Sequence, residues 1–231
     1  MISNKEFKKN IQQLEQQERY QFQAELIPSW FEKAVVLILF WEEAGTIKVV
    51  LTERSTKLKT HTGEVSFPGG RMEQGESLMQ TALREANEEI GIDRQKVNMI
   101  GRLDDAWSGA AYHLAALVGW YDDIPYFTAN TDEVGKILIP DIDELYDENN
   151  RKERIVERHG LVFKSTSIKY QDSLIFGLTA DLLCEALEQG LGTNTERGSQ
   201  RAENLQNALN SQFFAYQKSN GNRPPQSDLV K

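Results

Sequence analysis

Short apolar segments, separated by Gly, Pro, Asn and Asp, follow one another along the chain and predict β-strands. Residues 112–121 form an almost continuous apolar run, which is typical of a strand in the interior of a sheet. The segment from Glu42 to Gly45 predicts a hairpin turn between the first two strands. We expect strands at residues 35–41, 47–52, 97–103, 112–121, 134–139, 155–163 and 173–176.

Apolar residues at helical spacing predict helices before and after these strands. Residues 3–20 carry a thin apolar stripe that we expect to pack on the domain or on another subunit, namely Phe7, Ile11 and Leu14. The acidic stretch 141–153 predicts a short helix and a loop, and residues 178–188 predict a helix that ends at Gly190. A last short helix is expected from the spacing of Ala202, Leu205, Ala208, Leu209 and Phe213.

The order of these elements predicts an α/β fold in three parts. Strands mixed with helices, without regular βαβ alternation, favour a mixed sheet between helices. We expect an N-terminal helical extension at residues 1–30, the folded domain at 31–192 and a polar C-terminal extension at 193–231. Residues 219–231 are rich in Gly, Pro, Asn and Ser and are expected to be disordered.

One further helix, predicted at residues 77–90, concentrates the candidate chemistry. Ser77 and Gln80 form a capping-box pattern at its start, and Gly91 follows its last turn. On a period of 3.6 residues, one face is apolar and is expected to be buried, with Met79, Ala82, Leu83, Ala86 and Ile90.

Three glutamates, Glu85, Glu88 and Glu89, share another face of this helix. Carboxylates at this spacing repel each other, and negative charge late in a helix opposes the helix dipole. A hard divalent cation such as Mg²⁺ or Mn²⁺ would explain them, because these ions take oxygen ligands. A solvated acidic face is the alternative that the glutamates alone would favour.

The surrounding residues decide between these interpretations. Gly70 is followed after five residues by Glu76, and after seven more by the segment from Arg84 to Gly91, which reads REANEEIG. This pattern resembles the Nudix box, and the chain is similar in this stretch to Nudix hydrolases. The resemblance implies the α/β/α sandwich of that family, with a mixed sheet, and metal-dependent cleavage of a nucleoside diphosphate linked to another group.

The resemblance also implies roles for these residues. The metal ligands would be Glu85, Glu88, Glu89 and the carbonyl of Gly70, holding Mg²⁺ or Mn²⁺. Arg84 would orient a glutamate of the cluster, and Glu76 would support the loop. Two carboxylates, Glu85 and Glu133, remain candidates for the general base.

A second motif lies upstream of the box. Residues 51–55, LTERS, and 67–70, FPGG, resemble the additional signature of the coenzyme A pyrophosphatase branch of the Nudix family. That branch cleaves coenzyme A or its thioesters to adenosine 3′,5′-bisphosphate and 4′-phosphopantetheine. The chain departs from the branch at residues 108–117, where alanines replace an expected Thr-Pro pair, so that the acyl preference stays open.

Basic residues near this motif suit such a substrate. Coenzyme A carries a 3′-phosphate besides its pyrophosphate, and arginine can bind phosphate through two hydrogen bonds. A solvated basic loop is the alternative interpretation for the lysines. The expected substrate-binding residues are Arg54, Ser55, Lys57, Lys59 and His61. His113 and His159 have no recognisable partners in the sequence and are interpreted as structural.

Composition narrows the function classes. The formal charge of −9 over 231 residues argues against nucleic acid as a partner. The single cysteine, Cys184, lies in an apolar helical run and is expected to be buried and inert, as in a reducing compartment. The first residues lack the apolar core of a signal peptide, and the longest apolar run, Ala34 to Trp41, is too short for a membrane span. We expect a cytoplasmic protein without a membrane partner.

Two other functions stay open. A Nudix hydrolase for ADP-ribose or a dinucleotide such as NADH would use the same box. A sensor that binds a nucleotide without cleaving it would not need to keep all three glutamates. The partner is expected to be a small-molecule substrate, and a homodimer is possible.

Overall fold

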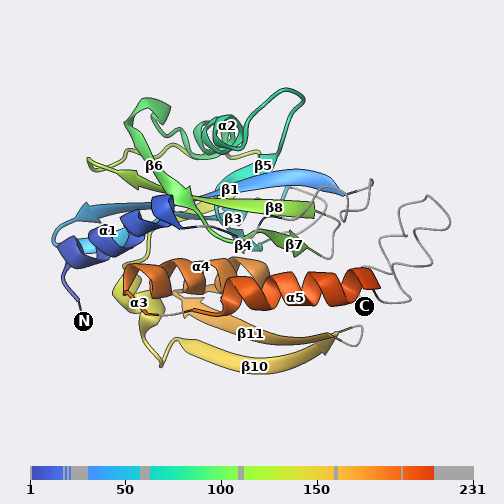
Figure 1. Cartoon of the computed structure of the whole chain (residues 1–231). Coiled ribbons are helices and arrows are strands. Elements are labelled where there is room, and N and C mark those ends of the chain that lie inside the picture. Colours follow the sequence, from blue (N-terminus) through green and yellow to red (C-terminus); the bar gives the residue numbers. More distant parts are fainter. Residues whose placement is uncertain are drawn as a thin grey trace.

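A long strand, β1 (Glu32–Glu43), crosses the middle of the main sheet in the computed structural model (Figure 1). The structure describes residues 2–17, 19, 21, 31–57, 63–108, 112–158, 161–193 and 195–210. Strand β1 runs parallel to β8 and antiparallel to its other partners, so the predicted mixed sheet is confirmed. Around β1 lie β2 (Thr46–Val49), β8 (Tyr112–Tyr121) and β6 (Val97–Arg102), with β5 (Gly69–Arg71) paired to β1 and β7 (Ala106–Ser108) paired to β8.

Helices cover both faces of this sheet. Alternate residues of β1 point to opposite faces, so Leu37 and Leu39 pack under α2 (Leu78–Ile90) while Ile38 and Phe40 belong to the core on the other face. That second core is closed by α1 (Asn4–Gln12), α4 (Gly177–Gly190) and α5 (Arg197–Asn210) (Figure 1). The chain therefore has the predicted α/β/α arrangement.

The prediction of one strand over residues 47–52 is wrong. Strand β2 ends at Val49, and β3 (Leu51–Arg54) begins a second sheet with β4 (Val65–Ser66) and β9 (Val134–Leu138). A continuous run of apolar residues stays buried across the change of sheet, so the sequence shows no break there. The predicted hairpin turn between β1 and β2 is confirmed, with positive φ at Ala44 and Gly45.

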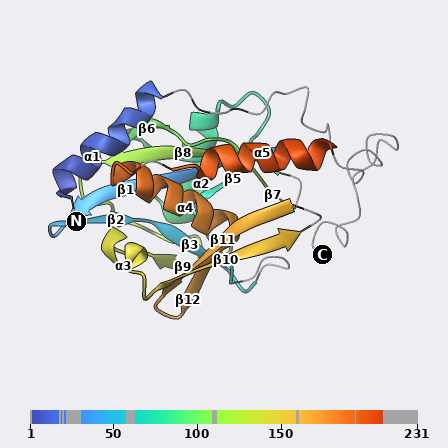
Figure 2. The same ribbon diagram turned by 60° about the horizontal axis from the view of Figure 1, so that its bottom comes forward.

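A third sheet lies beneath α4 and α5 (Figures 1 and 2). Its strands are β10 (Arg151–Arg158), β11 (Leu161–Tyr170) and β12 (Ser173–Phe176). The predicted single strand over residues 155–163 is wrong, because β10 ends and β11 begins within that range and the two pair as an antiparallel hairpin. The expected short helix in the acidic stretch is α3 (Ile142–Tyr146).

The N-terminal apolar stripe was predicted to pack on the domain or on another subunit, and it packs on the domain. Phe7, Ile11 and Leu14 are all buried, and the rings of Phe7 and Phe40 meet edge to face with 5.6 Å between centroids. The α-helix is shorter than predicted, because it ends at Gln12 and continues as a 3₁₀ turn, η1 (Gln13–Gln16). A second 3₁₀ turn, η2 (Arg94–Lys96), follows α2.

The predicted C-terminal helix is present as α5. Phe213 and the segment 219–231, predicted to be disordered, lie outside the described residues. Among the helices that the structure describes, none is long and apolar enough to cross a membrane.

Candidate active site

Helix α2 begins and ends as its sequence predicts. Ser77 accepts a hydrogen bond from the N–H of Gln80, whose side chain accepts one from the N–H of Ser77. Gly91 has a φ of 69°, in the left-handed region that glycine adopts without strain. The predicted buried face needs two corrections, because Met79 is 49% exposed and Leu83 is only half-buried. The buried residues of the helix are Thr81, Ala82, Ala86, Glu89 and Ile90.

The three glutamates of α2 lie in different environments. The side chain of Glu88 is 55% exposed, that of Glu85 is 15% exposed, and Glu89 is buried. The carboxylate of Glu89 accepts a hydrogen bond of 3.2 Å from the N–H of Gly69. The carboxylates therefore extend from the protein interior to the surface along one side of the helix.

Burial raises the pKa of Glu89 to about 8. The hydrogen bond from Gly69 lowers this pKa, and the negative charges of Glu85 and Glu133 raise it further. Burial also raises the pKa of Glu85, against the lowering effect of Arg84. Both carboxyl groups therefore lose a proton less readily than an exposed glutamate, mainly because they are buried and also because other carboxylates lie nearby.

Strand β5 brings the backbone of Gly70 against this cluster. Gly70 pairs with Val35 of β1, and its missing side chain would point at the carboxylate of Glu85. A Cβ atom at position 70 would clash with that carboxylate. Glycine at this position therefore leaves the space beside the strand that the carboxylate of Glu85 occupies.

Arg84 connects the helix to the preceding loop. Its Nη1 donates to Glu85 at 2.9 Å and to Glu88 at 3.1 Å, and its Nε donates to Glu76 at 2.8 Å. Its Nη2 donates to the carbonyl of Arg71 at 3.0 Å. Arg84 thus fixes two glutamates relative to the strand that carries Gly70, and Glu76 supports the loop as predicted.

These residues suit a hard divalent cation by their chemistry. Carboxylate and carbonyl oxygens are the ligands that Mg²⁺ and Mn²⁺ prefer, and a cation would supply the positive charge that the raised pKa values of Glu85 and Glu89 call for. In the described part of the chain, no three acidic, histidine or cysteine side chains already surround one point. The exposed side chain of Glu88 is held by Arg84, which also holds Glu85.

The sequence of the chain identifies its family. A family profile of the NUDIX domain matches residues 31–157, more than half of the chain. The chain belongs to the Nudix family.

Curated relatives carry the same family name. Nudix hydrolase 22, chloroplastic, from Arabidopsis thaliana is 38% identical over 175 residues, which cover 71% of this chain and 58% of that protein. Nudix hydrolase 3 from Caenorhabditis elegans is 37% identical over 140 residues, 58% of this chain and 54% of that protein. The chain thus spans little more than half the length of these relatives. A solved MutT/nudix family protein from Enterococcus faecalis is 16% identical, with a TM-score of 0.46, over 95% of this chain and 86% of that protein.

The second general-base candidate of this Nudix domain, Glu133, ends the turn before β9. Its side chain is exposed, and its charge raises the pKa of both Glu85 and Glu89. The carbonyl of Glu133 accepts a hydrogen bond of 2.8 Å from the N–H of Ser55. The segment after β3 is therefore attached to the turn that carries this carboxylate.

The predicted substrate-binding residues lie in that segment, as far as it is described. Arg54 lies close enough to Glu89 to lower its pKa, and Lys57 forms an exposed ion pair with Asp132 at 3.1 Å. Ser55 is buried, and its hydroxyl donates to the carbonyl of Thr131 at 3.4 Å. Lys59 and His61 lie outside the described residues. Their predicted contacts with substrate stay predictions, and the same holds for the roles of Arg54, Ser55 and Lys57.

One arginine within the Nudix box has a partner that the sequence did not indicate. Arg71 follows Gly70, and its Nη2 donates to the hydroxyl of Tyr112 at 2.6 Å while its Nε lies 2.9 Å from Glu32. Tyr112 belongs to the segment that departs from the coenzyme A branch. The departing segment therefore borders the strand that carries the candidate metal-binding carbonyl.

The structure agrees with the interpretation of His113 as structural, and it shows a partner that the sequence did not indicate. Its Nε2 lies 2.8 Å from Asp105, a buried carboxylate that also pairs with Arg102. Burial, together with the charges of Lys33 and Arg102, lowers the pKa of His113 to about 4, so the neutral ring donates to Asp105. Arg102 ends β6, Asp105 lies between β6 and β7, and His113 belongs to β8, so no sequence motif joins the three residues. His159 lies outside the described residues.

Proposed function

We propose that this Nudix domain hydrolyses the pyrophosphate of a nucleoside diphosphate derivative, with a divalent metal ion. The observation that carries this proposal is the carboxylate cluster of α2, packed against Gly70 and held by Arg84. A helix face selected only for stability would not bury Glu89 with a pKa of about 8. An unreactive nucleotide sensor would not require this arrangement.

The proposed metal ligands are Glu85, Glu88, Glu89 and the carbonyl of Gly70, as the sequence predicts. Mg²⁺ or Mn²⁺ held by these residues would offset the negative charge of the phosphate oxygens and would make the attacking water more acidic. Arg84 holds Glu85 and Glu88 in position without being a ligand, because its guanidinium cannot donate electrons to a cation. Glu76 holds Arg84 in turn.

Glu133 is the better of the two candidates for the general base. Glu85 is already engaged by Arg84 and packed against Gly70, whereas Glu133 is exposed and faces the same cluster from a separate turn. In the proposed reaction Glu133 accepts a proton from water, the water oxygen bonds to one phosphorus, and the bridging P–O bond breaks. The departing phosphate carries away the electron pair of that bond.

We further propose that the substrate is coenzyme A or one of its thioesters. The products would be adenosine 3′,5′-bisphosphate and 4′-phosphopantetheine, with its acyl group where one is present. Arg54 supports this proposal, because it is positively charged and lies at the border of the carboxylate cluster. Lys57, Lys59 and His61 follow it in the sequence and would add positive charge toward the 3′-phosphate.

A comparison of coenzyme A with dephospho-coenzyme A tests this specificity. The two differ only in the 3′-phosphate, and a charge-assisted hydrogen bond is worth roughly 1.5–3 kcal/mol, or about ten- to a hundredfold in kcat/KM. We expect coenzyme A to be favoured by that factor, and Arg54→Ala to remove most of the difference. Lys136→Ala, at an exposed lysine of β9, is the matched control and should keep it. Equal kcat/KM for both substrates in the wild-type protein would contradict the proposed recognition of the 3′-phosphate.

A further inference from the structure

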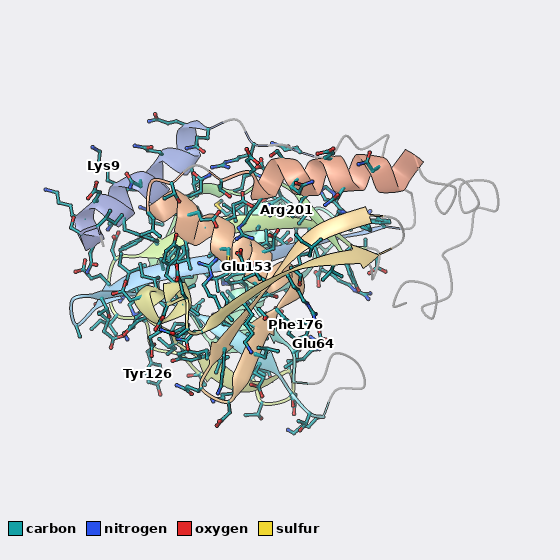
Figure 3. The ribbon with its side chains drawn as sticks, turned by 90° about the horizontal axis from the view of Figure 1, so that it is seen from below. Lys9, Glu64, Tyr126, Glu153, Phe176 and Arg201 are labelled. Carbon is teal, nitrogen blue, oxygen red and sulfur yellow. The ribbon has the colours of Figure 1, made fainter. Side chains whose placement is uncertain are left out.

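The lower sheet has one face that no other described element covers. Helices α4 and α5 pack on its upper face, and the view from below shows β10 and β11 in front with no described element over them (Figures 1 and 3). Side chains alternate along β12, so Ser173 and Ile175 are buried while Leu174 and Phe176 are exposed. The labelled Phe176 in Figure 3 lies on this open face.

Pairing between the strands places cations beside these two apolar residues. Lys152, Ser167 and Phe176 are paired in one row across the three strands, and Lys169 is paired with Leu174. Arg154 lies two residues beyond Lys152 on the same side of β10. We define the open face by its exposed members: Lys152, Arg154, Lys169, Leu174 and Phe176.

The charge of the open face is opposite to that of the chain. It carries three cations, and none of its defined members is acidic, although the whole chain has a formal charge of −9. Charges more than about 8 Å away are largely screened at physiological ionic strength. A flat partner in contact with this face would therefore experience its local positive charge.

We propose that the open face is a docking surface for an anionic lipid bilayer. Its cations would lie among lipid phosphates, and Leu174 and Phe176 would insert at the level of the headgroups. Two apolar side chains are too few for the buried centre of a typical protein interface, which involves 20–30 residues on each side. A second copy of the chain bound through the same face would bring like charges together.

This surface is connected to the candidate active site. Ser173 of β12 donates a hydrogen bond of 2.6 Å to Glu53, the residue before Arg54 on β3. Docking would therefore hold the sheet β4-β3-β9 close to the bilayer. Such a peripheral contact needs no spanning helix, and it is an alternative to the expectation that the protein has no membrane partner.

Co-sedimentation of the full chain with lipid vesicles tests the proposal. We expect binding to vesicles of equal phosphatidylcholine and phosphatidylserine, weaker binding at high salt, and none to phosphatidylcholine alone. Lys152→Ala and Arg154→Ala should each weaken binding about fivefold, from the typical contribution of one cation near an anionic surface. Leu174→Ser and Phe176→Ser should weaken it as well.

A matched control lies on the other face of the same sheet. Ile155 is 71% exposed, but it is paired with Lys164 one position away from Arg154 and so points to the opposite side. Ile155→Ser should bind the mixed vesicles as tightly as the wild type, and thermal melting confirms that each variant is folded. The proposal would be overturned if Ile155→Ser weakened vesicle binding as much as the variants of the open face do, or if the folded wild type did not bind the vesicles. Capture of polyglutamate in place of vesicles would also overturn it and would indicate an acidic protein partner.

Discussion

At the scale of single residues, the separate environments of Glu85, Glu88 and Glu89 explain how one helix face can serve as a candidate site. The motif predicts all three as metal ligands, but a helical period cannot predict which carboxylate is buried. That depends on the second sheet and on Gly69, whose N–H binds Glu89. The residue types were predictable from the sequence, and their pKa shifts were not.

Glu88 offers the cleanest test of a proposed ligand. Its side chain is exposed, and Arg84 is its one partner in the described part of the chain, so we expect Glu88→Gln to keep the melting temperature of the wild type. Loss of a charged ligand should lower turnover at least ~10²-fold, about 2.7 kcal/mol of activation free energy. Glu73→Gln, at an exposed glutamate of the loop before α2, is the control and should remain active. Near-normal turnover of the folded Glu88→Gln protein would remove Glu88 from the site.

At the scale of elements, local patterns predicted α2, the hairpin after β1 and the position of β8. These elements have a clear period or a turn signal within a few residues. The break between β2 and β3 and the pairing of β10 with β11 depend on which sheet each strand joins. The residues are equally hydrophobic before and after the chain passes from one sheet to another, so the sequence predicted neither the break nor the pairing.

The loop before α2 is held by a charged contact that responds to pH. The hydrogen bond from Arg84 lowers the pKa of Glu76 to about 2, with help from Thr81 and the N–H of Glu73. The ordinary pKa is 4.5, so the contact contributes its full stability above that value and loses it as the pH falls toward 2. We expect wild-type stability to decrease over this range more steeply than that of Glu76→Gln. Denaturant unfolding at a series of pH values measures how the free energy of unfolding of each protein changes with pH. The same change in both proteins would contradict the predicted contribution of this contact.

At the scale of the whole molecule, a buried charge network attaches α5 to the domain. Arg201, labelled in Figure 3, pairs with Glu185 and with Asp181, the latter at 2.7 Å. Arg197 binds Asp181 and Glu188. Glu185 is fully buried, and burial raises its pKa. The polar composition after residue 192 predicted an extension but not this network, because the partners lie on α4 and, for the carbonyl of Asp104 that accepts from Arg201 at 3.2 Å, in the loop after β6.

Removal of Arg201 should destabilise the whole domain. Arg201→Ala leaves Glu185 buried with less positive charge, a change that typically costs about 3–5 kcal/mol. The double variant Arg201→Met/Glu185→Met should recover much of that loss, since no charge then remains unpaired. Arg94→Ala, at an exposed arginine, is the control. Denaturant unfolding of the wild type and the three variants measures the free energy of unfolding of each. If Arg201→Ala lowers this free energy by less than about 1 kcal/mol, the usual value of a surface ion pair, the network contributes little to stability.

Product analysis tests the central claim most directly. The purified chain is incubated with coenzyme A, ADP-ribose or NADH in the presence of Mg²⁺ or Mn²⁺, and the products are identified by mass. We predict adenosine 3′,5′-bisphosphate and 4′-phosphopantetheine from coenzyme A, with little of either when Glu88→Gln replaces the wild type. Intact coenzyme A beside cleaved ADP-ribose or NADH would contradict the proposed substrate, and no cleavage of any of the three by folded protein would contradict the proposed hydrolysis.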